Sequence, residues 1–160
     1  IYLYGDFGVE LCGLQSALIA LPSMLKIDDL TKQGLPFYGA GITYQIEQLP
    51  KISDGERLVV RFDAAEAAYL RLTGQHVNRV MAFAPFECDI TDWIKDGLSA
   101  LDITVMLNRR NTFGPLHLIP DRPSAIGPEH FLTEGDGFKS DGYSLIPQGS
   151  IDGLCFVIES

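Results

Sequence analysis

The chain has 160 residues, of which 46% are hydrophobic and 21% are charged, a balance that is typical of a folded globular domain. Its formal net charge of −9 makes the surface acidic. An acidic surface repels phosphate backbones, so the composition argues against nucleic acid as a partner. No apolar run approaches the roughly 18 residues that cross a bilayer, so we expect no membrane partner either.

The three cysteines, Cys12, Cys88 and Cys155, lie among apolar residues and are odd in number. This pattern predicts three buried thiols that pack as small hydrophobic side chains, and it does not support a disulfide framework. Cysteine usage therefore leaves the compartment unknown. The chain begins at Ile1 inside an apolar alternating segment and carries no signal peptide, so we expect a fragment excised from a larger multidomain protein.

The first forty residues predict two strands and a helical turn. Residues 1–11 are rich in aromatic and branched side chains, which indicates a strand with a turn or bulge at Gly5 and Asp6. Residues 17–21 are expected to form a second strand that ends at Pro22. The short polar stretch 28–34 ends in glycine and suits a single helical turn.

The middle of the chain has the clearest strand patterns. Residues 41–49 alternate strictly, with Ile42, Tyr44 and Ile46 on one face. A hairpin turn is expected at residues 73–75. Further strands are expected at residues 57–62, 67–73, 76–83, 85–91 and 100–107.

The last third begins with a long irregular connection over residues 108–142, which contains four prolines and several glycines. A connection of this length is usually functional, or it holds another surface in place. Extended segments follow at residues 143–147 and 153–158. Eight or nine short strands, regular turn signals and no long helix predict an all-β antiparallel jelly-roll β-sandwich that spans residues 1–160 as a single domain.

Four segments between residues 58 and 108 resemble a known family. A strand enters a short hairpin, a proline-aromatic strand ends in an Asp-Ile-Thr turn, and a Lys-x-Gly turn leads into an alternating strand. This order is similar to the sugar-binding jelly roll of β-galactosidase and β-glucuronidase type glycoside hydrolases, a galactose-binding-domain-like fold. The chain departs from the family at two turn positions. It has Thr73 before the hairpin glycine and Leu98 after the Lys-x-Gly turn, and the family usually has Asn at both. The segments are residues 58–62, 67–75, 84–97 and 101–108.

Two further segments resemble the carboxy-terminal sandwich domains of large, often bacterial, glycosidases. Residues 34–38 match a Gly-x-Pro-Phe-Tyr motif, and residues 111–117 match an Asn-x-x-Gly-Pro-x-His motif. The resemblance covers most of residues 33–117. It implies a carbohydrate-binding-like accessory domain whose partner is the catalytic domain of the same parent chain.

Catalytic machinery is not expected in this chain. A glycosidase needs two carboxylates about 5 to 9.5 Å apart across a sugar. Many acidic residues here precede glycine in turns, as Asp54 and Asp96 do. The three histidines share no metal-ligand spacing and no Gly-x-Ser-x-Gly motif occurs. The resemblance places the catalytic pair on a barrel domain outside this chain, so we expect no enzyme activity from the chain alone.

A sugar site needs an aromatic platform with polar groups at its rim, because apolar ring faces stack on sugar C–H surfaces. The alternative is that such residues cap the core or, for the arginines, pair with acids on a neighbouring domain. We expect no cofactor, although residues 134–142 have the oxygen ligands for a structural calcium ion, with a solvated acidic loop as the alternative. The candidate sugar-binding residues are Phe37, Tyr38, Trp93, Arg109, Asn111 and His117.

Three functions remain open. The first is a non-catalytic accessory domain that packs against a catalytic domain through the proline-rich connection. The second is an autonomous carbohydrate-binding module that holds a glycan through loop aromatics. The third is a free-standing esterase-like or lyase-like enzyme, which would need a pair of buried carboxylates in a cleft. Coplanar exposed aromatics would favour the module, and an apolar patch without a groove would favour the docking domain.

Overall fold

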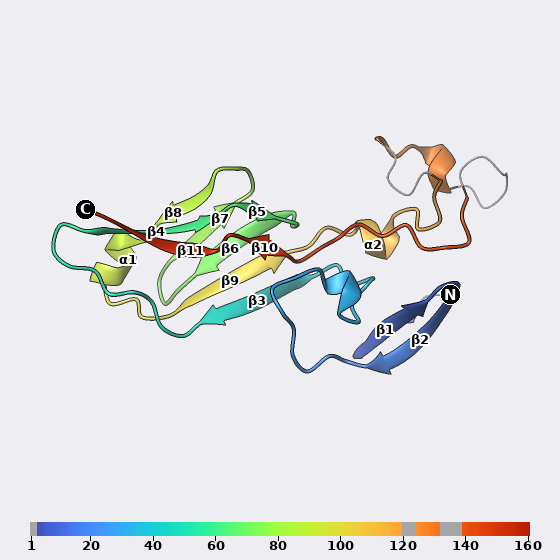
Figure 1. Cartoon of the computed structure of the whole chain (residues 1–160), viewed down its shortest axis with the longest axis horizontal. Helices are drawn as coiled ribbons and strands as arrows, with labels where there is room; N and C mark the ends of the chain where they lie inside the picture. The colour runs from blue at the N-terminus through green and yellow to red at the C-terminus, as the bar shows by residue number, and fades with distance from the viewer. Residues whose placement is uncertain (1–2, 120–123, 132–138) are drawn as a thin grey trace. The chain divides into compact units, whose positions relative to one another are not determined.

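A computed structural model describes residues 3–119, 124–131 and 139–160 (Figure 1). The chain is an all-β protein whose strands pair only in antiparallel sheets within these ranges, and none of the sheets closes into a barrel. The elements in chain order are β1 (Phe7–Cys12), β2 (Gln15–Ala20), η1 (Leu30–Lys32), β3 (Gly41–Ile46), β4 (Arg57–Phe62), β5 (Ala64–Ala65), β6 (Tyr69–Thr73), β7 (Asn78–Met81), β8 (Phe86–Asp89), α1 (Thr91–Lys95), β9 (Leu101–Met106), α2 (Arg110–Phe113), η2 (Pro128–Phe131), β10 (Ile151–Asp152) and β11 (Cys155–Glu159).

The chain divides into two compact units, each made from two stretches of sequence. Unit 1 comprises residues 1–39 and 108–148, and unit 2 comprises residues 40–107 and 149–160. The sandwich predicted from the sequence lies in unit 2. The expectation of one domain over the whole chain stays a prediction.

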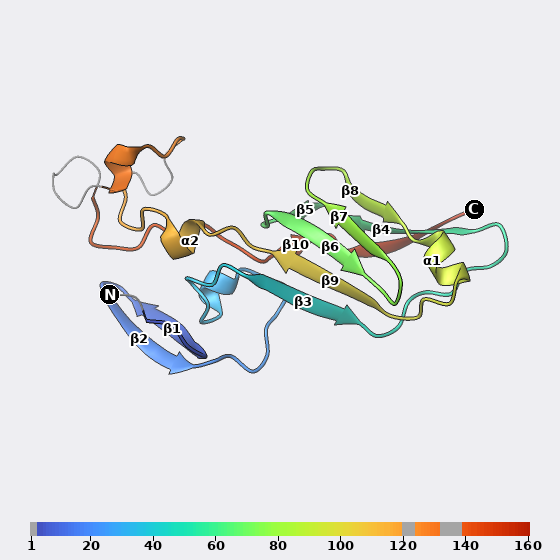
Figure 2. The same cartoon turned by 180° about the vertical axis from the view of Figure 1, so that it is seen from behind.

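Unit 2 contains a four-stranded sheet in the order β3-β9-β6-β7, which Figure 2 shows from one side. Alternate residues of β9 and β6 are buried, because successive side chains of a strand point to opposite faces. Ile103 pairs with Tyr44 of β3 on one side and with Leu72 of β6 on the other, which aligns the apolar positions of three strands. The alternation found in residues 41–49 and 100–107 therefore identifies the core face of this sheet.

The second sheet of unit 2 has three strands in the order β11-β4-β8. Leu58, Val60 and Phe62 alternate along β4 and are almost fully buried. They form a core with the apolar face of the four-stranded sheet, as two antiparallel sheets do in a sandwich. The short pair of β10 with β5 adds to this unit and was not expected from the sequence.

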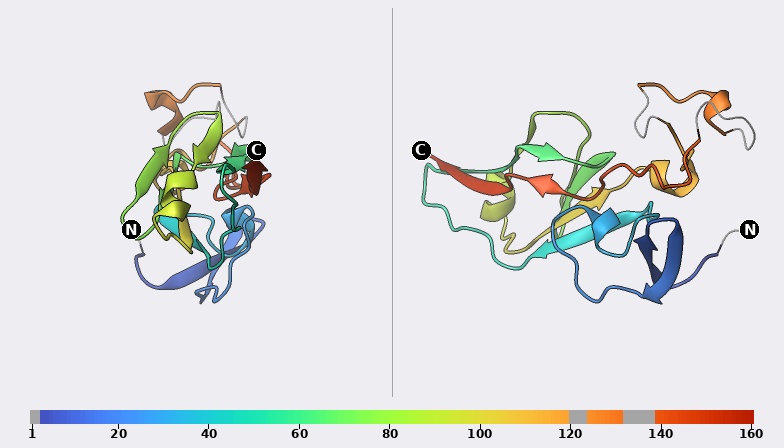
Figure 3. Two further views of the ribbon diagram at one scale, coloured as in Figure 1. Left: turned by 90° about the vertical axis from the view of Figure 1, so that its left-hand side faces the viewer. Right: turned by 45° about the vertical axis from the view of Figure 1, so that its right-hand side comes forward.

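Among the residues of unit 1 that the structure describes, there is little regular structure, and the one sheet is the hairpin of β1 and β2. Figure 3 shows these two strands side by side. Cys12 pairs with Gln15, which leaves a two-residue loop in which Gly13 has φ +62°. A two-residue hairpin loop of the II′ type needs glycine at its first position, and this requirement explains why position 13 is a glycine. On the edge of β1 that does not pair with β2, the N–H of Val9 donates to the carbonyl of Gly34 at 2.8 Å.

Buried polar groups hold the rest of unit 1 together. The Asp29 carboxylate accepts from the hydroxyl of Thr31 at 2.7 Å and from the backbone N–H of Gln148 at 3.2 Å. The N–H of Leu30 in turn donates to the carbonyl of Gln148 at 2.8 Å. Burial raises the pKa of Asp29, but the hydrogen bonds from Thr31 and Gln148 outweigh it, so the pKa is lowered overall. The bonds to Gln148 join segments more than one hundred residues apart in the sequence.

One expectation requires correction. Of the three cysteines, only Cys88 is buried, whereas Cys12 at the hairpin turn and Cys155 on β11 are exposed. Apolar neighbours in the sequence misled the prediction, because Cys12 lies in an uncovered hairpin and Cys155 faces outward. The expected irregular connection contains one turn of helix in α2 and another in η2, each four residues long.

Candidate functional site

The predicted sugar-binding residues lie in both units. Phe37, Tyr38, Arg109, Asn111 and His117 belong to unit 1, whereas Trp93 belongs to unit 2. Trp93 lies on α1, is partly buried, and accepts a backbone hydrogen bond from the N–H of Leu98 at 2.9 Å.

Asn111 is fully buried. Its side-chain amide donates to the carbonyl of Ile146 at 2.8 Å, and its amide oxygen accepts from the N–H of Ile146 at 3.0 Å. These two bonds satisfy both backbone groups of one residue, so the side chain acts as a clamp between two segments of unit 1. This geometry gives Asn111 a structural role and leaves it no solvent-facing surface for a ligand.

The rings of Phe37 and His117 both contact the ring of Tyr143 in unit 1. Tyr143 is a residue that the sequence did not single out. The ring of Phe37 meets that of Tyr143 edge-on, with centroids 5.2 Å apart and planes at 61°. The ring of His117 lies 4.9 Å away on Tyr143, with planes at 40°. His117 also has its Nδ1 atom 2.9 Å from the carbonyl oxygen of Gly142. The rings are not coplanar, so they do not form a flat platform for a sugar face.

The Phe37–Tyr38 segment is joined to α2. The hydroxyl of Thr112 donates to the carbonyl of Phe37 at 2.8 Å. Gly39 packs so closely on Thr112 that a Cβ atom at this position would press on the threonine hydroxyl. The exposed Arg109 at the start of α2 has its guanidinium 6.0 Å from the ring centre of Phe113. The structure thus brings Phe37, Tyr38 and Arg109 into one region of unit 1.

Unit 2 has an open pocket of about 290 Å³ that the sequence analysis did not identify. It lies where the β6–β7 turn meets the connection from α1 to β9. The only indication in the sequence was the hairpin glycine, because Gly74 lets this turn contact the side chain of Leu98 closely. The pocket is lined by Thr73, Gly74, Gln75, Gly97, Leu98, Ser99, Ala100 and Asp102.

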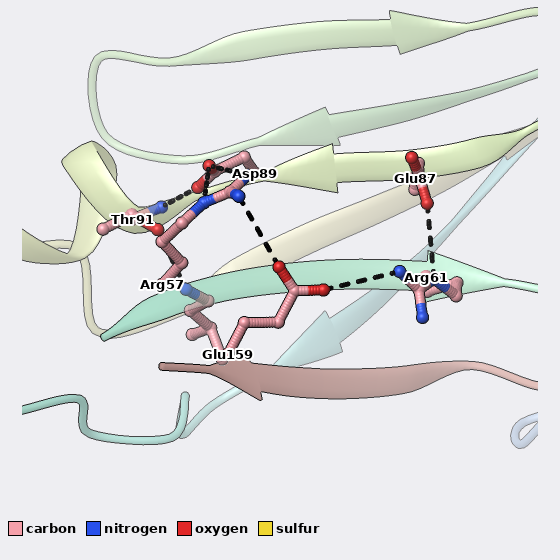
Figure 4. Close-up of polar contacts among 7 residues, drawn as sticks. Arg57, Arg61, Glu87, Asp89, Thr91 and Glu159 are labelled. Carbon is pink, nitrogen blue, oxygen red and sulfur yellow. Dashed lines mark hydrogen bonds and ion pairs between the residues drawn. The ribbon is translucent and has the colours of Figure 1, made fainter. Parts of the chain in front are cut away.

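Charged side chains cross the outer face of the three-stranded sheet (Figure 4). Arg57 of β4 contacts Asp89 of β8 at 2.8 Å and Glu159 of β11 at 3.6 Å. Arg61 contacts Glu87 at 3.3 Å and the other oxygen of Glu159 at 3.7 Å. These exposed ion pairs form a ladder that covers the sheet face, and exposed pairs of this kind contribute little to stability singly.

Asp89 has a second role in this ladder, because its other carboxylate oxygen accepts from the N–H of Thr91 at 2.9 Å. Hydrogen bonds from the side chain and backbone of Thr91, together with the guanidinium of Arg57, lower the pKa of Asp89 to about 2. The hydroxyl of Thr91 also accepts from the N–H of Leu58 at 2.9 Å. Asp89 therefore links the start of α1 to the sheet, and this arrangement is structural.

No group of three or more His, Cys, Asp or Glu side chains placed to hold a metal ion is found in the described ranges. The acidic loop expected as a calcium site, residues 134–142, lies mostly outside the described residues, since 132–138 are not among them. Across residues 3–119, 124–131 and 139–160, no helix has the length and apolar character needed to cross a membrane. No known protein-family model matches the chain, and no curated protein matches it.

Proposed function

We propose that this chain is a non-catalytic accessory domain of a glycoside hydrolase, which packs against the catalytic domain of its parent protein through unit 1. The observation that carries the proposal is the distribution of apolar side chains. Among the described residues, unit 1 contains twelve of the fifteen exposed large hydrophobic side chains, but only two of the sixteen buried ones. A large exposed apolar surface is typical of a protein–protein interface.

The β1–β2 hairpin and the loop after it carry the largest share of this surface. Leu14 and Leu18 are 67% and 59% exposed, and Met24 in the following loop is 87% exposed. Five of the six residues of β2 are exposed. A two-stranded hairpin is marginally stable in water by itself, so it gains most from a partner that covers its apolar face.

The link to glycoside hydrolases comes from the sequence resemblance. The segments that carry it coincide with β4, β6, β8 with α1, and β9, and these are four of the seven strands in the two larger sheets of unit 2. In this proposal, unit 2 is the rigid sandwich and unit 1 is the surface that meets the catalytic domain.

The alternative is an autonomous carbohydrate-binding module that uses the loop aromatics of unit 1. Arg109 beside the exposed ring of Phe113, and the nearby Tyr38, favour this alternative. The angles of 61° and 40° between the rings at Tyr143 count against it, because a sugar face needs a flat apolar surface. The docking domain is therefore the better supported function.

Hydrogen–deuterium exchange tests the docking proposal. We expect amides of residues 7–27 to exchange more slowly in the longer parent protein than in the isolated chain. Leu18→Ser should reverse that protection without unfolding the chain, whereas Val80→Ser, at a 49% exposed site in unit 2, should leave it unchanged. Equal exchange in the isolated chain and the parent would overturn the docking proposal.

A second measurement tests the absence of catalysis. The isolated chain is expected to release no chromophore from aryl glycosides, while the longer parent protein hydrolyses at least one of them. Turnover by the isolated chain that survives repeated purification would contradict a non-catalytic role.

A further inference from the structure

Strand β2 has an edge that pairs with nothing. Val9 of β1 lies opposite Leu18 of β2, and the N–H of Val9 donates to the carbonyl of Gly34, away from β2. In an antiparallel pair, two opposite residues either bond each other or both point their backbone groups outward, and these two kinds of pair alternate. Val9 belongs to the outward kind, so Leu18 does too. By the same alternation Ser16 and Ala20 also point outward, and no described residue bonds to the outward backbone groups of β2.

This edge lies in an uncharged part of an acidic chain. Residues 11–25 contain no charged side chain, although the whole chain has a net charge of −9. Outer strands are usually protected against pairing by a charged residue, a proline or a bulge, and β2 contains none of these. Three of the four outer strands of the larger sheets do carry charge, namely β7 with Arg79, β8 with Glu87 and β11 with Glu159. The β2 edge is therefore open to strand pairing.

We propose that β2 pairs antiparallel with β2 of a second copy of this chain, about a two-fold axis at Leu18. In this register Leu18 faces Leu18 of the other copy, and Ser16 faces Ala20 of the other copy. Each such pair exchanges both of its N–H···O bonds, so every outward backbone group of β2 gains a partner. The two hairpins become one four-stranded sheet in the order β1-β2-β2-β1.

A second copy fits this edge for physical reasons. Two chains that each carry −9 repel each other, so they meet most easily where neither is charged, and residues 11–25 provide such a surface. The register also places the two Leu18 side chains side by side, each next to Val9 of its own hairpin, and so covers a leucine that is 59% exposed in the single chain. The assembly closes at two copies, because a two-fold contact uses the β2 edge of both.

This inference goes beyond the docking proposal. Docking uses the apolar face of the hairpin, whereas the pairing of copies uses the edge of β2 in the plane of the sheet. Docking is judged by exchange in the longer parent protein, and pairing by the mass of the isolated chain. Either can therefore fail alone.

Sedimentation velocity of the whole chain measures the association. A pair of six-residue strands is a small interface, so we expect the weight-average mass to rise from that of one chain toward that of two between about 10 μM and about 1 mM. No species larger than two copies is expected, because the β2 edge is then used up.

Amide proton shifts over the same concentration range locate the contact. The amide protons of Ser16, Leu18 and Ala20 should move downfield as the concentration rises, because their N–H groups gain acceptors. Those of Ala17 and Ile19 should move less, because the alternation of the hairpin already bonds them to β1. A pattern that alternates along β2 is specific to edge pairing, since contact through a face of the sheet would not produce it.

A charge placed at the two-fold axis tests the register. Leu18→Lys brings two like charges together and should weaken the association about tenfold or more. Leu14→Lys is the matched control, because it adds the same charge at a turn position that is 67% exposed and lies away from the axis, so its effect should be much smaller. An equimolar mixture of Leu18→Lys and Leu18→Glu chains should regain the association, because opposite charges then meet.

Three results would overturn the inference. A mass of one chain at every concentration would exclude the pairing of copies, and downfield shifts of the same β2 amides in the parent protein alone would assign this edge to a strand of the catalytic domain. Association without alternating shifts along β2 would show contact through another surface. Equal weakening by Leu18→Lys and Leu14→Lys, with no recovery in the mixture, would remove the two-fold axis from Leu18.

Discussion

The two units of this chain are stabilised by different physical means. Fourteen of the sixteen buried hydrophobic side chains among the described residues lie in unit 2, whose two larger sheets supply alternating apolar faces. Unit 1 contains four of the five buried polar residues, namely Asp29, Asn111, Ser144 and Gln148. Unit 2 therefore depends on non-directional apolar burial, and unit 1 on individual hydrogen bonds that tolerate little change.

The largest effect is expected in the core of unit 2. Ile103 is fully buried in the central strand β9, and Ile103→Ala should lower the free energy of unfolding by about 2–5 kcal/mol, through lost burial and the cavity that remains. Urea unfolding followed by exchange of unit 2 amides measures it. Val80→Ala, at an exposed site of the same sheet, is the control. A loss no larger than that of the control would show that β9 is not central to this core.

The next effect tests the polar clamp of unit 1. Asn111→Ala removes both bonds to Ile146 and leaves its backbone N–H and carbonyl unpaired, at a cost of about 1–3 kcal/mol. Exchange of the Ile146 amide should speed up, while amides of β9 stay protected. Asn78→Ala, on exposed β7, should change neither. If Asn111→Ala loosened β9 as much as Ile146, the distinction between the two units would fail.

This contrast also explains how much the sequence predicts. In unit 2, β4 was predicted at its observed bounds and β9 to within one residue at each end, because alternation is a local signal of burial on one face. The hairpin at Gly74 was predicted from its turn chemistry, and it is confirmed by the pairing of β6 with β7. The same signals underlie the all-β sandwich, which the structure confirms.

Unit 1 was largely beyond prediction, because its contacts join residues far apart in sequence. Nothing around Asn111 or Gln148 indicates that these residues bond to Ile146 and Asp29. Asn111 was expected at a sugar site because its residue type and loop position fit. Neither of these features indicates whether the side chain is buried. Tyr143 was overlooked for the same reason, and the pocket beside Gly74 arises only when two separate turns meet.

A smaller effect is expected at Asp89, which joins α1 to the sheet. Asp89→Ala should cost about 1 kcal/mol, because the N–H of Thr91 loses its acceptor. Asp89→Asn keeps an acceptor oxygen at this position and should cost less. Thermal unfolding of the two variants separates the contribution of the hydrogen bond from that of the charge. Equal losses of stability in the two variants would show that the charge alone matters.

The same residue predicts a pH dependence. The pKa of Asp89 is about 2 in the folded chain and ordinarily 3.8, so its stabilisation is present above the ordinary value and is lost as the pH falls. The loss should occur between about pH 4 and pH 2. Asp89→Asn should flatten this part of the stability profile, and Asp54→Asn in an exposed turn should not. The lowered pKa of Asp29 acts in the same direction within unit 1.

The smallest effect is expected on the outer face of the three-stranded sheet. Glu159 contacts both arginines of β4, at 3.6 Å and 3.7 Å, yet all three side chains are substantially exposed. Glu159→Gln should shift the urea midpoint slightly at low salt, and this shift should disappear at high salt, because exposed pairs are screened. The Asn111 clamp in unit 1 should show no such salt dependence. A Glu159 effect that persists at high salt would mean that this side chain stabilises β11 by packing rather than by charge.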